Sequence, residues 1–221
     1  MSLDKKDLPQ YKLKNEIPNS ITHWIGALFA LGVLIFFIIK EIKERIPFLR
    51  MGPFYFYVFS MLVVFVISTL YHSSKFNSKY RVVMRIIDHS DIYLFVAGTY
   101  FPICMSGVEP FSLGIIMAII EFAFALYGIL ANSIPNNSKF LRLSAYIVYI
   151  IQGWLLLFFL PFGAKVAPEV FWPVLTGGIL YSVGAILYAI GKKKIYFHTI
   201  FHIFVVLGAV VQFIGIFFLL G

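Results

Sequence analysis

The chain has 221 residues, of which 61% are hydrophobic and 13% charged, and its mean hydropathy is +0.91. Soluble domains use about half apolar and about a quarter charged residues, so this composition excludes an ordinary soluble domain and indicates a polytopic membrane protein. The net charge of +8 would suggest nucleic acid binding in a soluble protein. In a membrane protein, loop lysines and arginines that set the topology explain it, and we expect no nucleic acid partner.

Seven apolar windows, bounded by charged residues, Pro or Gly, follow an N-terminal segment over residues 1–19. They predict an all-α integral membrane protein, a seven-helix bundle whose transmembrane domain covers residues 20–221. The windows are continuously apolar rather than alternating, which argues against a transmembrane β-barrel. The predicted helices lie at about 20–39, 53–72, 86–105, 111–131, 143–162, 171–190 and 198–220.

The distribution of Lys and Arg predicts the orientation. Thirteen of these residues fall in the N-terminal segment and in the second, fourth and sixth loops, and five fall on the opposite side. By the positive-inside rule, the N-terminus is cytoplasmic and the C-terminus lies outside. The first loop, on the outer side, is itself basic, but Glu41 and Glu44 partly offset its charge.

All five histidines fall near the cytoplasmic ends of the predicted helices. His23 opens the first helix, His72 ends the second and His89 lies in the first turn of the third. His198 and His202 are four residues apart, so they share one face of the last helix. Histidines that served only as scattered packing residues would have no reason to collect in one leaflet.

His72, His198 and His202 fit a metal site. An i, i+4 pair on one helix and a third His from a neighbour bring three imidazoles to a tetrahedral ion and leave the fourth position for water. Zinc suits neutral nitrogen ligands best among the common ions. The alternative is that the histidines lie in the headgroup region and only form hydrogen bonds. The spacing and matching depth favour the metal.

Asp88 and Ser68 are the candidate catalytic residues beside this site. Asp88 can accept a hydrogen bond from a ligand His or from a metal-bound water, and can take the proton when that water attacks. Ser68, one turn before His72, can orient the water or stabilise an oxyanion. The alternatives are helix capping for Asp88 and close helix packing for Ser68. His89 is expected to point away from Asp88 on a helix and is excluded as a ligand, although it is the obvious substitute if one of the three is not.

Four further polar residues need a role. Asn19 can cap the first helix after Pro18, and we expect Glu16 and His23 to brace the cytoplasmic mouth by hydrogen bonds to other helix ends. Glu121 stands near the middle of the fourth predicted helix, where an unpaired carboxylate is energetically costly. It can face an internal lipid cavity, be protonated, or pair with a polar group such as Gln152 or Gln212.

These residues are the ones by which the chain resembles the haemolysin III family, the bacterial branch of the progestin and adipoQ receptor proteins. The similarity runs from about residue 15 to the end. Five short motifs occur in the family's order: Glu16, Asn19, Thr22 and His23; Ser68-Thr69-Leu70-Tyr71-His72; Asp88-His89-Ser90 with Ala97-Gly98-Thr99-Tyr100 and Pro102; Gly177-Gly178 with Tyr181, Gly184 and Tyr188; and His198 with His202.

The resemblance implies a seven-helix protein of the bacterial inner membrane. It also implies a zinc ion bound by His72, His198 and His202, with Asp88 and Ser68 beside it. The wider superfamily includes alkaline ceramidases, which hydrolyse lipid amides, and bacterial members are linked to membrane-lipid homeostasis. Gln212 stands where many bacterial members are expected to have His, but it lies deep in the last helix, far from the predicted zinc.

Three functions are compatible with these predictions. The first is a zinc-dependent intramembrane hydrolase of a lipid amide or ester. The second is a lipid sensor in which zinc is structural and Asp88 can be its fourth ligand. The third is a cytolytic pore, which would need a polar stripe through both leaflets. Membrane lipid is the expected partner, as substrate or ligand, and the identity of the lipid and the oligomeric state stay open.

Overall fold

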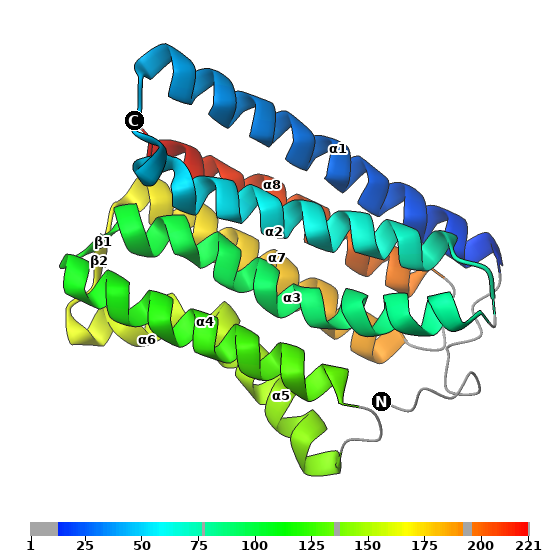
Figure 1. The fold of residues 1–221 in the computed structure, drawn as a ribbon. Coiled ribbons are helices and arrows are strands. Elements are labelled where there is room, and N and C mark those ends of the chain that lie inside the picture. The colour runs from blue at the N-terminus through cyan, green and yellow to red at the C-terminus, as the bar shows by residue number, and fades with distance from the viewer. Residues whose placement is uncertain (1–12, 77, 135–137, 192–195, 221) are drawn as a thin grey trace.

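A computed structural model describes residues 13–76, 78–134, 138–191 and 196–220, and nearly all of them are helical (Figure 1). The lysines outside these ranges, on which the predicted orientation partly rests, are Lys5, Lys6, Lys12, Lys192, Lys193 and Lys194. The elements in chain order are α1 (Leu13–Glu44), α2 (Phe48–Ser73), α3 (Lys79–Ser106), β1 (Val108–Glu109), α4 (Phe111–Ser133), α5 (Lys139–Gly153), α6 (Leu155–Phe159), the 3-10 helix η2 (Leu160–Phe162), β2 (Lys165–Val166), α7 (Pro168–Gly191) and α8 (Phe197–Phe218).

Five helices, α1, α2, α4, α7 and α8, are long and apolar enough to cross a membrane. The chain from α5 to η2 adds a sixth candidate if its two bent parts are counted as one span. Helix α3 has 28 residues, which is also sufficient length, but its first half carries several charged residues. It packs between α2 and α4 (Figure 1). Three of its charged side chains, Arg81, Asp88 and Asp91, are buried, whereas Lys79 at its start is exposed.

The chain over residues 143–162 is not the single helix that its hydropathy predicts. It breaks between α5 and α6, and the two parts are bent by 68°. The Tyr100 hydroxyl from α3 donates to the carbonyl of Gly153 at 3.2 Å and accepts from the amide of Leu156 at 3.4 Å. These two bonds replace helical hydrogen bonds that the bend removes, which a backbone inside a membrane requires.

Helices α1 and α3 each begin seven residues earlier than the hydropathy predicts. Helix α1 starts at Leu13 and runs through Pro18, so Asn19 lies inside the helix and does not cap it. Helix α3 starts at Lys79, where the Ser78 side chain accepts from the Arg81 amide at 3.1 Å. Asp88 is therefore in the third turn of α3, too far from the helix end for the capping alternative.

The helices approach closely where glycine removes a side chain. A Cβ on Gly98 of α3 would lie 2.0 Å from the Ser60 Oγ of α2, and one on Gly208 of α8 would lie 2.3 Å from the Tyr181 ring of α7. Small residues allow this close packing between membrane helices. An antiparallel pairing of β1 with β2, Val108 opposite Val166, joins the connections at the end of the bundle that also holds the C-terminal end of α8 (Figure 1).

Candidate metal centre

The three predicted ligand histidines lie together at one end of the bundle. His72 is in the last turn of α2, and His198 and His202 are in the first two turns of α8. One possible ligand atom from each side chain lies within 4.8 Å of the other two. The ring centroids of His72 are 4.9 Å from both other rings, and those of His198 and His202 are 4.5 Å apart. The three side chains can therefore hold one metal ion.

The rings of His72 and His202 each have a hydrogen-bond partner for the ring nitrogen Nδ1, as is common for histidines that bind a metal. The Nδ1 of His72 is 2.5 Å from a Glu16 carboxylate oxygen, and the Nδ1 of His202 is 3.2 Å from the Asn19 carbonyl oxygen. Histidine ligands commonly donate their second ring N–H to a carboxylate or carbonyl, which fixes the tautomer and turns the other nitrogen to the metal. The Nε2 of His72 is buried and has no hydrogen-bond partner among the described residues, which fits a missing metal bond.

Asn19 connects the first helix to the last. Its side chain is fully buried, and its Oδ1 accepts a hydrogen bond of 2.5 Å from the Thr199 hydroxyl, while its backbone carbonyl contacts His202. The predicted capping role of Asn19 is thus replaced by a role in positioning α8. Asn19 follows Glu16 by about one helical turn, so the two residues lie on the same side of α1.

Glu16 contacts two other buried polar side chains, His72 and Arg81, and the sequence does not predict this cluster. Besides contacting His72, it forms an ion pair with Arg81 of α3, whose side chain is 1% exposed. The Arg81 guanidinium also donates to the carbonyls of Tyr71 and Ser74, at 3.2 and 3.0 Å, and lies over the Tyr71 ring. The predicted helix bounds place Arg81 in the second loop, among the thirteen basic residues that indicate the orientation, but the structure buries it beside Glu16. A sequence signal could have placed Arg81 inside a helix. Ser78 is a typical helix-capping residue, and Arg81 follows it, two helical turns before Asp88.

Glu16→Gln should weaken zinc binding by about 10–100-fold, because the amide supports His72 less strongly than a carboxylate does. It should also lower the free energy of unfolding by about 3–5 kcal/mol, since Arg81 keeps its buried charge and loses its partner. Chelator competition and chemical unfolding in detergent measure the two effects. The matched control is Glu44→Gln, which breaks the exposed Lys40–Glu44 pair of 2.8 Å and should cost about 0–1 kcal/mol. Equal effects of the two variants would contradict this role for Glu16.

Asp88 and Ser68 lie beside the histidine cluster. Both side chains are buried, and the Ser68 hydroxyl donates a hydrogen bond to the Asp88 carboxylate. Among the described side chains, the group whose ligand atoms lie within 4.8 Å comprises the three histidines and does not include Asp88. His89 also lies outside that group. The expectation that it points away from Asp88 is wrong, because its Nδ1 lies 3.3 Å from an Asp88 oxygen. The Asp88 carboxylate is therefore close enough to interact electrostatically with His72 and His198 without belonging to the histidine group.

His23 has a different position from the predicted brace at the mouth. Its ring stacks on His202, with centroids 3.7 Å apart and 17° between the planes, and meets Phe65 edge-on at 5.2 Å. Neither ring nitrogen has a hydrogen-bond partner among the described residues. His23 thus restricts the His202 ring by packing, whereas Glu16 makes the hydrogen bonds to other helix ends that were expected of both.

Glu121 does not belong to this centre. It is buried in α4, and the Gln152 side chain of α5 contacts its backbone carbonyl at 3.3 Å. Gln212, the other suggested partner, instead donates to the carbonyl of Val174 at 3.4 Å.

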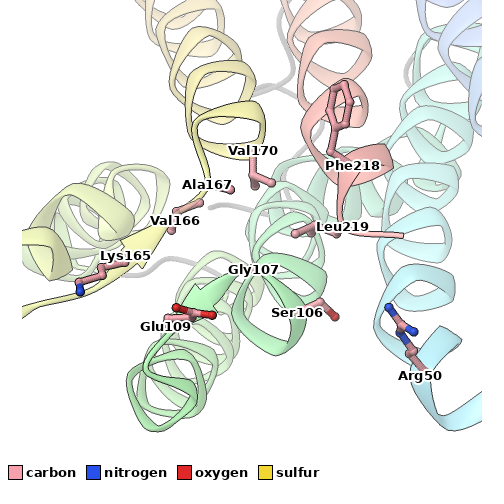
Figure 2. Close-up of a pocket in the computed structure, with 10 residues that line it drawn as sticks. All are labelled: Arg50, Ser106, Gly107, Glu109, Lys165, Val166, Ala167, Val170, Phe218 and Leu219. Atoms are coloured by element: carbon pink, nitrogen blue, oxygen red, sulfur yellow. The ribbon is translucent and has the colours of Figure 1, made fainter. Parts of the chain in front are cut away.

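A cavity of about 580 Å³ opens at the opposite end of the bundle (Figure 2). Arg50, Glu109 and Lys165 are its charged lining residues, and Val170 and Phe218 are among the apolar ones. Arg50 precedes His72 by 22 residues of α2, which corresponds to about 30 Å along the helix. The cavity is therefore separate from the histidine cluster.

Comparison with known proteins gives consistent matches over nearly the whole chain. The model of the family described as Haemolysin-III related matches residues 11–213. A Bacillus subtilis (strain 168) protein named Hemolysin-3 homolog is 36% identical over 209 residues, covering 94% of this chain and 95% of that protein. A Bacillus cereus protein named Hemolysin-3 is 36% identical over 207 residues, covering 93% and 92%.

Proposed function

Because the chain belongs to the haemolysin III family of membrane proteins, we propose that it is a zinc-dependent intramembrane hydrolase of a lipid amide or ester. Such an activity would contribute to membrane-lipid homeostasis. The observation that carries this proposal is the arrangement of three imidazoles around a common point, with the Ser68–Asp88 pair beside them. Three protein ligands and a nearby acid are typical of a catalytic zinc site, which keeps one position open.

Each residue of the proposed site would have a separate role. His72, His198 and His202 would hold the ion. Bound zinc would supply Lewis-acid chemistry, polarising a carbonyl group and making water more acidic. Asp88 would take the proton of the attacking water and return it to the leaving group. Ser68 would orient Asp88 through their hydrogen bond and can turn its hydroxyl toward the developing oxyanion.

The placement of this site in the membrane is also part of the proposal. We infer seven spans, counting α3 and the bent α5–α6 segment, with a cytoplasmic N-terminus and an outer C-terminus in the bacterial inner membrane. Arg81 is buried in an ion pair and does not count as a topological charge, yet the remaining basic residues still favour the predicted cytoplasmic side by twelve to five. The lipid carbonyl would therefore enter from the cytoplasmic leaflet.

One other function has a specific structural observation in its favour, and another is suggested by name only. The metal centre joins four helices, α1, α2, α3 and α8, at one end, which would suit a structural zinc in a non-enzymatic lipid sensor. The position of Asp88 outside the ligand group favours the hydrolase, because a closed structural site would need a fourth ligand. Cytolytic activity is suggested by the names of the relatives alone.

The decisive test is turnover by the purified protein in lipid vesicles. The assay offers a labelled lipid amide and the matched lipid ester and measures the fatty acid released. We expect zinc-dependent release from one of them, loss of release on chelation, and recovery with zinc but not with magnesium. Absence of release from both lipids by zinc-loaded protein would contradict the hydrolase. A change of unfolding temperature with lipid composition in that same protein would then support the sensor.

A further inference from the structure

Glu121 is a buried acid in the middle of a membrane-spanning helix. It is residue 11 of the 23 residues of α4, so it lies about 17 Å from either end of a helix about 35 Å long. Its side chain is 1% exposed, and neither carboxylate oxygen has a hydrogen bond of good geometry among the described residues, although the Gln152 side chain is close enough to interact with the carboxylate. A charged, unpaired carboxylate at this depth costs several kcal/mol, so an intramembrane acid of this kind indicates function.

The side-chain amide of Gln152, which contacts the Glu121 backbone, has an oxygen that accepts no hydrogen bond from the described residues. Gln152 is fully buried, and its Nε2 donates to the backbone carbonyls of Tyr93 and Glu121, at 3.0 and 3.3 Å. Both amide hydrogens are thereby used, and the Oε1 has no partner among the described residues. Gln152 is also the residue just before Gly153, where α5 ends and the 68° bend begins.

The other polar groups nearby do not neutralise Glu121. Tyr100 and Cys104 of α3 are close enough to interact electrostatically with Glu121. The Tyr100 hydroxyl already donates to the Gly153 carbonyl, and Cys104 is a buried thiol. The described residues provide no Lys, Arg or His in an ion pair with Glu121. Within the described ranges, two oxygens of Glu121 and one of Gln152 thus have no positive charge paired with them, and the Gln152 amide is the donor group that interacts with the carboxylate.

We propose that Glu121 and Gln152 form a binding site for one monovalent cation, a proton or Na⁺, at the bend between α5 and α6. One carboxylate balances one positive charge, and oxygen ligands suit hard cations rather than zinc. A proton on Glu121 would convert the carboxylate into a donor for the Gln152 Oε1, satisfying both groups with one bond. Ion sites of membrane transporters are commonly formed in this way at interrupted helices. This site is independent of the metal centre and of the proposed hydrolase activity.

The proton form can be tested by infrared spectroscopy of the full-length protein in lipid nanodiscs. In Na⁺-free buffer at neutral pH, the wild type should show the carbonyl band of a protonated carboxyl that Glu121→Gln lacks. The Gln variant should fold, because its amide can donate to Gln152 in place of the carboxyl proton. Glu109→Gln, at the end of the bundle, should keep the band. Gln152→Met should shift the band to higher frequency, since the carboxyl loses its acceptor, and it provides the test if Glu121→Gln does not fold.

The Na⁺ form is tested by thermal unfolding of the same samples. Bound Na⁺ should raise the unfolding temperature by roughly 5 °C at saturation, remove the protonated carboxyl band, and have no effect on Glu121→Gln. Choline chloride at equal ionic strength should not reproduce the shift. Both effects should persist in His198→Ala, which separates them from zinc binding. Absence of both the Glu121-dependent band and the Na⁺-dependent shift would overturn the proposal.

Discussion

His198→Ala should reduce the bound zinc from about one ion per chain to nearly none. With only His72 and His202 left, two imidazoles would have to hold the ion, and removal of a ligand should cost more than the 10–100-fold that loss of a supporting group costs. His198 is the least buried of the three ligands, so a small side chain there disturbs the fold less than it would at His72. Elemental analysis of detergent-purified protein after gel filtration measures the metal content directly.

The matched control is His89→Ala. His89 lies near the same end of the bundle, about a third exposed and outside the ligand group, so its loss should leave zinc unchanged. Wild-type protein that is folded and metal-free after growth with zinc would remove the basis of the metal centre. Equal zinc loss in both variants would mean that it reflects a general disturbance rather than loss of a ligand.

Asp88→Asn should abolish lipid hydrolysis while the zinc stays bound. The amide can still accept the hydrogen bond from Ser68, but it cannot take a proton from water, and loss of a general base costs about 10²–10⁴-fold in rate. Because Asp88 is not among the three clustered ligands, the metal content should remain near one per chain. Release of fatty acid and zinc content are measured on the same preparation.

Two results would separate the roles proposed for Asp88. Loss of zinc in Asp88→Asn would make the acid a fourth ligand and would favour the structural centre of a lipid sensor. Full activity with zinc retained would show that Asp88 is not the base. Glu109→Gln, a change of the same chemistry at the opposite end of the bundle, is the control and should retain both zinc and activity.

The sequence predicts the ligands of the centre because their signals are local. His198 and His202 share a helix face by their spacing, and His72 reaches the same depth once the direction of α2 is known. The starts of α1 at Leu13 and of α3 at Lys79 are not predicted, because hydropathy detects only the apolar part of a helix. The polar turns of α1 and α3 that precede this part hold Glu16 and Arg81, whose favourable partners lie on other helices.

The remaining contacts have no sequence signature. Asn19 supports His202 through a backbone carbonyl, which every residue possesses, so its side chain gives no hint of that contact. His23 stacks on His202, a packing relation that depends on how α1 meets α8. The bend after Gly153 depends on a hydroxyl from α3 that compensates for the lost helical bonds, and hydropathy cannot detect such compensation.

The contacts between Asn19 and α8 also determine the order in which the centre can be assembled. Asn19 is separated from Thr199 by 180 residues and from His202 by 183, so Asn19 meets these two partners only when the last helix is in place. A ribosome-bound chain that ends before α8 carries one of the three ligands, His72, and an unmatched support on α1. Such long-range closure comes late in folding, because the intervening chain must be ordered first. Metal capture would therefore occur after insertion of the final helix, and a chain interrupted before that point would hold no zinc at this site.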